Sequence, residues 1–126
     1  MRALLVAAAV LVCAWFALAA RQAHDTAHAQ AIVAGSTQLG PAEARRAASL
    51  LDAAGFLNPD RQVDLVRAQL DLERGLPAQA NAVAAVLVRA EPENVQAWLW
   101  VAAHALHVHD QTRALDTIAR LVPPVR

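Results

Sequence analysis

Residues 92–121, PENVQAWLWVAAHALHVHDQTRALDTIARL, carry the clearest helix signals in the chain. Pro92 and Asn94 precede an apolar run, and asparagine is a preferred residue at the position that caps a helix N-terminus. A second helix start is expected at Asp110, and that helix must end at Pro123 because proline interrupts helical hydrogen bonding. The stretch therefore predicts two helices joined by a short turn.

Glycine and proline divide the preceding residues in the same way. They predict helices over residues 41–55, 58–74 and 77–90, each opened by a proline near its start and two of them closed by a glycine. No stretch alternates between apolar and polar residues over the length of a strand, so no sheet is expected. The predicted fold class is all-α.

These helix signals recur along the chain. Residues 61–92 and 95–126, aligned at an offset of 34 residues, share eight identities, which indicates an internal repeat. Upstream, Ala47 precedes Ala80 by 33 residues and Pro59 precedes Pro92 by the same distance, as if one residue were missing from a turn. The positions that define the repeat are Ala47, Pro59, Ala68, Ala80, Pro92, Trp98, Ala102 and Ala114.

Paired helices with this period resemble the tetratricopeptide repeat, whose pattern is Trp-x2-Leu-Gly-x2-Tyr, then Ala-x3-Phe, then Pro. The last unit matches best, with Trp98-x2-Val101 followed by Ala114-x3-Ile118. The resemblance implies a short right-handed superhelix of antiparallel helix hairpins. Trp98 is expected in the core between the helices of its own hairpin, and the alanines allow close helix approach.

The N-terminal segment is the most apolar part of the chain. Eighteen residues from Ala3 to Ala20 carry no charge and correspond to about 27 Å of helix, close to the thickness of a hydrocarbon core. We expect a transmembrane anchor at residues 1–21. Residues 22–40 would form a juxtamembrane helix or the first helix of a degenerate repeat, and residues 41–126 the repeat domain.

The sidedness and processing of this segment follow from its flanks. Arg2 precedes the apolar run, which favours a cytoplasmic N-terminus and places the repeat domain outside the cytoplasm in a single-pass topology. The competing interpretation is a signal peptide, because small-x-small cleavage patterns end at Ala19 and at Ala29. Cleavage would release a secreted or periplasmic protein of the same fold.

Composition and motifs exclude several function classes. The formal net charge is zero and no basic cluster is present, so nucleic acid is not an expected partner. The sequence contains no nucleophile elbow, no phosphate-binding glycine loop and no His-Glu-x2-His motif. We therefore expect a protein without enzymatic activity and without a cofactor.

The two closely spaced tryptophans indicate where a partner binds. Trp98 and Trp100 point in nearly opposite directions on a helix, so a buried Trp98 leaves Trp100 facing elsewhere. In the tetratricopeptide family the first helix of each unit lines a concave groove for peptides or protein segments. The alternative is that Trp100 packs against an adjoining helix. The predicted binding face comprises Gln62, Leu65, Val66, Gln69, Glu73, Gln96, Leu99, Trp100, Ala103 and His107.

Two further expectations concern the C-terminal part of the chain. Leu115, Ile118 and Leu121 have no capping helix after them, so they predict an apolar edge and self-association. His104 and His107 share a helix face and leave open a metal or pH sensor as an alternative function. Zinc requires three or four convergent ligands, however, and no metal site is expected.

Overall fold

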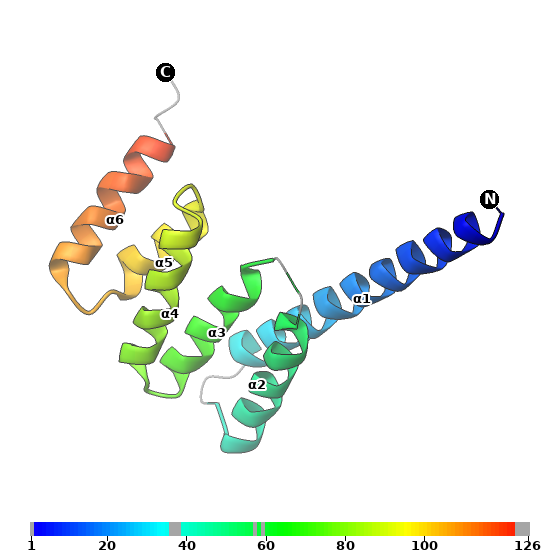
Figure 1. Ribbon diagram of the computed structural model, residues 1–126. Helices are drawn as coiled ribbons and strands as arrows, with labels where there is room; N and C mark the ends of the chain where they lie inside the picture. Colours follow the sequence, from blue (N-terminus) through cyan, green and yellow to red (C-terminus); the bar gives the residue numbers. More distant parts are fainter. Residues whose placement is uncertain (1, 36–38, 57, 59, 123–126) are drawn as a thin grey trace.

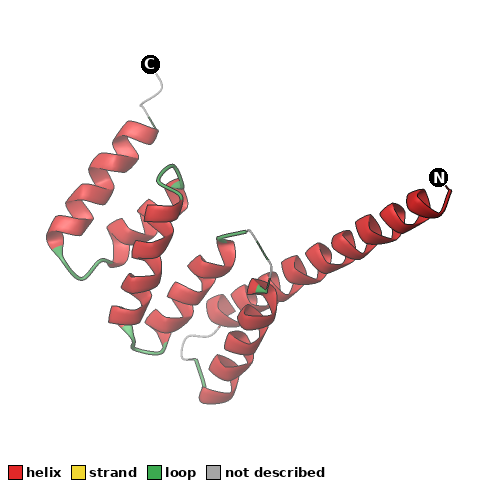
Figure 2. Cartoon of the chain, viewed as in Figure 1, coloured by secondary structure: helices red, strands yellow, loops and turns green. Residues whose placement is uncertain are grey.

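The computed structural model describes residues 2–35, 39–56, 58 and 60–122, and this part of the chain contains six α-helices and no strand (Figure 2). The predicted all-α class is confirmed. In chain order the helices are α1 (Arg2–Gly35), α2 (Pro41–Gly55), α3 (Gln62–Glu73), α4 (Pro77–Ala90), α5 (Val95–His104) and α6 (Val108–Leu121).

The helices pack as three successive pairs, α1 with α2, α3 with α4 and α5 with α6. The pairs are joined through contacts of α3 with α1 and α2, and of α4 with α5. Figure 1 shows the pairs arranged side by side, while the N-terminal half of α1 projects away from them. Each helix therefore contacts mainly its neighbours in the sequence, as in helical-repeat proteins.

Most helix ends lie where local chemistry predicts them. Pro41 and Pro77 occupy the first positions of α2 and α4, where the missing N–H has no helical acceptor. Asn94 caps α5, because its Oδ1 accepts the Ala97 N–H at 3.0 Å. Gly75 follows α3 with φ +71°, a conformation that costs glycine little.

The start of α3 differs from the prediction. Residues 58, 60 and 61 lie outside the helix because two side chains hold the backbone in consecutive turns. Asn58 Oδ1 accepts the Asp60 N–H at 2.9 Å, and Asp60 Oδ1 accepts the Gln62 N–H at 2.9 Å. Such side-chain bonds compete with helical bonds, so the helix begins only at Gln62. Pro59, a predicted repeat position, lies outside the described residues.

The start of α6 differs in the opposite direction, because this helix begins earlier than predicted. His107, rather than Asp110, is the residue before the first helical turn. The Asp110 N–H already donates to the His107 carbonyl at 3.0 Å, and the Gln111 side chain donates to the Ala105 carbonyl at 2.9 Å. Asp110 therefore lies inside the first turn, where a negative charge is favourable. The predicted end at Pro123 lies outside the described residues, and α6 ends at Leu121.

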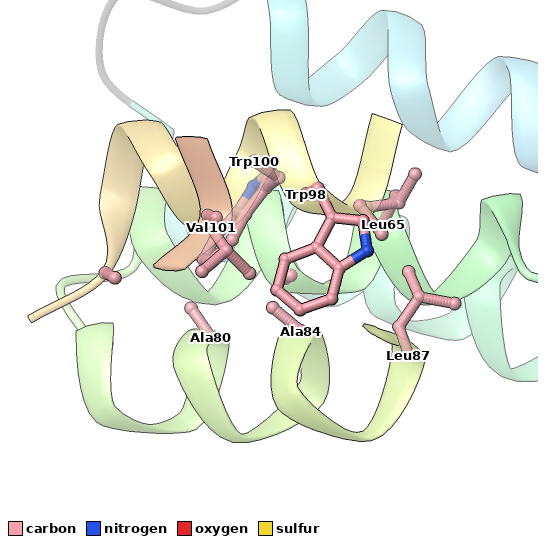
Figure 3. Packing of buried hydrophobic residues seen from close by; sticks show 11 residues of the cluster. Leu65, Ala80, Ala84, Leu87, Trp98, Trp100 and Val101 are labelled. Carbon is pink, nitrogen blue, oxygen red and sulfur yellow. The ribbon is translucent and has the colours of Figure 1, made fainter. Parts of the chain in front are cut away.

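Two hydrophobic cores hold the pairs together, and α3 contributes to both. The first core lies between α1, α2 and α3 and contains the fully buried Ala47 and Leu51. The second lies between α3, α4, α5 and α6 and contains Ala68, Ala80 and Ala114, none of which has any exposed surface (Figure 3). Ala102 is partly buried against the second core. Small residues thus occur where helices meet.

Helix α1 is continuous at residue 21, but its two halves differ in how much of their side-chain surface is buried. Between Ala3 and Arg21 every side chain is exposed except Leu18, which is partly covered. Gln22, Thr26, Ala29 and Val33 are buried and follow the spacing of one helix face. The N-terminal half is long and apolar enough to cross a membrane, whereas residues 22–35 form the first helix of the first pair.

Candidate binding surfaces

Trp98 lies in the second core with 7% of its surface exposed. Its ring lies over Ala84 of α4 (Figure 3), and its Nε1 donates to the Pro92 carbonyl at 2.8 Å. The tryptophan therefore joins α5 to the preceding helix pair through α4, a neighbour that the repeat pattern alone did not specify. The hydrogen bond also satisfies the indole N–H, which would otherwise be costly to bury.

Trp100 is buried as well, with 9% of its surface exposed, and belongs to the same core. The expectation that it presents its ring to a partner in an open groove is therefore wrong. The physical reason is that α5 packs against both α4 and α6, so more than one side of this short helix is covered. The ring centroids of His104 and Trp100 lie 4.8 Å apart, so the imidazole covers the indole further.

The other predicted groove residues do not form one open face. Leu65 is buried in the second core and Val66 in the first, so neither is available to a partner in the folded chain. The polar members on α3 are partly or fully exposed, and Gln69 donates to Glu73 at 2.9 Å. Leu99 is 52% exposed on α5. Of the remaining members of the predicted face, Gln62 is partly buried, and Gln96, Ala103 and His107 are exposed.

A hollow of about 620 Å³ opens instead between α4 and α6, with α5 as its floor. We call it the α4–α6 groove. Its lining is mainly apolar, and Leu106 in the α5–α6 turn is 55% exposed. The lining residues are Ala78, Asn81, Ala82, Ala85, Val88, Arg89, Pro92, Trp98, Val101, Ala105, Leu106, His107, Asp110 and Arg113. Apart from His107, none of the predicted binding residues lines it.

Charged groups lie among the apolar residues of the α4–α6 groove. Arg89 comes from α4, and Asp110 and Arg113 come from α6. Among the described residues neither arginine takes part in an ion pair. At one end, Asn81 donates to the carbonyls of Pro77 and His104 at 2.8 and 3.2 Å, which ties α4 to the end of α5. The groove therefore combines a fixed apolar floor with an excess of positive charge.

The histidines are dispersed through the fold. The His104 ring nitrogen lies 3.1 Å from the Trp100 carbonyl, so its orientation is fixed by its own helix. His107 lines the groove. On α1, the ring centroids of His24 and His28 lie 6.2 Å apart. Within the described residues, no group of three or more His, Cys, Asp or Glu side chains is placed to hold a metal ion.

The predicted apolar C-terminal edge is present only in part. Leu115 is 58% exposed on α6, whereas Ile118 and Leu121 are partly buried against the second core. Self-association through this edge stays a prediction. It would rest on Leu115 and on the exposed Val108 near the start of the helix.

Comparison of the chain with protein-family models, with curated proteins and with solved structures gives no match.

Proposed function

We propose that this chain is a membrane-anchored, non-enzymatic adaptor that binds a protein segment in the α4–α6 groove. The observation that carries the proposal is the groove itself, a hollow of about 620 Å³ with a mainly apolar lining. A hollow of this size accommodates a few side chains of a peptide or helix.

The proposal includes a tetratricopeptide-like right-handed superhelix as the scaffold. Three successive helix pairs support it, as do the alanines at the helix contacts. Ala47, Ala80 and Ala114, which follow one another at offsets of 33 and 34 residues, are fully buried. The predicted partner face on the first helices is replaced by the α4–α6 groove, because the expected anchor Trp100 is buried.

The anchor in this proposal is the N-terminal half of α1, which inserts through residues 3–20 and leaves the helix pairs on one side of the membrane. The exposure of this apolar stretch supports the proposal, because water is an unfavourable environment for such a surface. Arg2 on the N-terminal flank favours an extracytoplasmic position for the helix pairs.

The groove chemistry indicates a partner segment of a particular kind. Val88, Val101 and Leu106 favour aliphatic or aromatic side chains, whereas Arg89 and Arg113 favour a carboxylate close to them. We therefore propose a short segment that carries two or three apolar side chains and at least one acidic residue.

Site-specific photo-crosslinking in native membranes tests the proposal. A photoreactive phenylalanine replaces Ala85 or Leu106, which line the groove, and replaces Val86 as the control. Val86 lies on the same helix as Ala85 and is exposed, but it does not line the groove. We expect one shared crosslinked product from positions 85 and 106, reduced by Arg113→Glu, and none from position 86.

Other crosslinking patterns would reject the groove. The same yield from all three positions would indicate non-specific contact. Position 99 lies on the face predicted from the family resemblance. A product from this position, without one from position 85 or 106, would show that the partner binds the first helices of the pairs.

A further inference from the structure

The five aromatic side chains of the chain fall into two groups. Trp98 and Trp100 are buried in the second core. Trp15, Phe16 and Phe56 are exposed, and Phe56 is 66% exposed although it lies far from the other two in the sequence. Phe56 directly follows α2, and its surroundings indicate what its exposed ring can contact.

A hydrogen bond places Phe56 beside the end of the apolar run. The Gln22 side-chain amide donates to the Phe56 carbonyl, and Gln22 is itself buried. Gln22 directly follows Arg21, where the apolar run has ended. Thr26, one turn further along α1, donates to the Gln22 carbonyl at 2.8 Å. The C-terminal end of α2 is therefore held against α1 at the level where the proposed anchor leaves the hydrocarbon.

The loop between α2 and α3 extends this contact along α1. A hollow of about 420 Å³ is lined by α1 from Trp15 to Gln30 on one side and by Asn58, Asp60 and Gln62 on the other. Leu18, on the same part of α1, is the only partly covered side chain between Ala3 and Arg21. The described polar loop residues thus lie along the part of α1 where the apolar run ends, which is where an interfacial layer about 5–7 Å thick would begin.

We propose that Phe56 is a second membrane contact, which inserts its ring into the interfacial layer while Asn58 and Asp60 remain among the headgroups. This inference rests on the proposed membrane anchoring of α1. The occupant is lipid rather than protein because the same end of the fold continues directly into the apolar helix (Figure 1). Aromatic side chains favour this layer, and the contact fixes the tilt of the helix pairs on the membrane.

The charges near Phe56 indicate which lipids the contact requires. Arg61 pairs with Asp64 at 3.1 Å and Arg67 pairs with Asp52 at 2.8 Å. With Asp60, these five groups leave a net charge of −1, so no basic patch attracts anionic lipid. Insertion of Phe56 is therefore expected in neutral phosphatidylcholine bilayers.

Fluorine NMR of the full chain tests the inference, because the sequence contains only two phenylalanines, Phe16 and Phe56. The chain is labelled with 4-fluorophenylalanine and placed in phosphatidylcholine nanodiscs. Phe16→Leu assigns the signals, and Val86→Phe adds a reporter at an exposed position of α4. Line broadening is measured with a spin-labelled lipid and, separately, with a water-soluble gadolinium chelate.

The expected result is that the Phe16 and Phe56 signals both broaden several-fold more with the spin-labelled lipid than the signal from position 86. The gadolinium chelate should broaden the signal from position 86 most. If the Phe56 signal follows that of position 86 while Phe16 stays shielded, the second contact is rejected and the anchor is retained. If Phe16 is also exposed to gadolinium, the anchor fails and the inference fails with it.

Discussion

At the scale of single residues, the two tryptophans of α5 show what side-chain spacing predicts and what it misses. Their spacing places them on opposite sides of the helix, and Trp98 lies in the core. Spacing does not reveal how many sides of a helix are covered, and α5 has α4 on one side and α6 on another. Trp100 is buried for that reason, together with Leu65 and Val66 from the same predicted face.

The buried indole groups differ in hydrogen bonding, which leads to the first prediction. Trp98 Nε1 donates to Pro92, whereas Trp100 Nε1 has no hydrogen-bond partner among the described residues. Trp98→Phe removes both ring volume and a hydrogen bond, whereas Trp100→Phe removes similar volume and a buried, unpaired donor. We expect Trp98→Phe to lower the free energy of unfolding by about 1 kcal/mol more than Trp100→Phe does.

Denaturant unfolding of the two variants in detergent, followed by circular dichroism, measures this difference. Trp100→Ala provides the control for burial and should cost about 3–5 kcal/mol, as expected for a large core side chain. A loss below about 1 kcal/mol in that variant would show that Trp100 is not part of the core.

At the scale of secondary structure, helix ends set by a single residue are predictable and those set by a longer loop are not. Pro41, Pro77 and Asn94 each act on the turn in which they occur, so the starts of α2, α4 and α5 follow from sequence. The start of α3 depends on consecutive side-chain turns at Asn58 and Asp60, which a proline-based rule does not detect.

The second prediction concerns the cap of α5. Asn94 accepts the Ala97 N–H and also donates to the Glu91 carboxylate at 2.8 Å. Asn94→Ala removes both bonds at the start of the helix that carries the two tryptophans. We expect a loss of about 1 kcal/mol, or roughly 4 °C in melting temperature. Asn94→Ser retains a capping oxygen and should recover most of that loss in thermal melts monitored at 222 nm.

Equal destabilisation by alanine and serine at position 94 would contradict the capping role. In that case the hydrogen bond to Glu91, which serine does not reproduce, would account for the stability of this turn.

At the scale of the whole molecule, the repeat period is informative about the succession of helices but not about the position of the groove. The period reflects contacts that each unit makes with the next, and alanines at those contacts are recognisable in sequence. The α4–α6 groove depends on the distance between α4 and α6, each the second helix of its pair, with α5 between them. Its lining includes Val88, Leu106 and Arg113, which have no distinctive spacing, so only the folded chain brings them together.

The described structure also distinguishes between the two signal-peptide cleavage patterns. Cleavage after Ala19 would remove residues of α1 that are exposed apart from the partly covered Leu18, and it would leave the first helix pair intact. Cleavage after Ala29 would remove Gln22 and Thr26, both buried, together with Ala29, which has no exposed surface. Only the first position is compatible with the packing of α1 against α2.

The third prediction tests this packing with two truncated chains, one beginning at Ala20 and one at Gln30. The first retains the α1 face that covers the fully buried Leu51 and Ala47 and should melt as a folded helical protein. The second exposes part of that core to water, which weakens the hydrophobic stabilisation of α2. Circular dichroism should therefore show a loss of helix larger than the ten removed residues and a lower melting temperature. Equal melting temperatures for the two chains would mean that residues 20–29 contribute nothing to the fold, and cleavage after Ala29 would again be compatible with it.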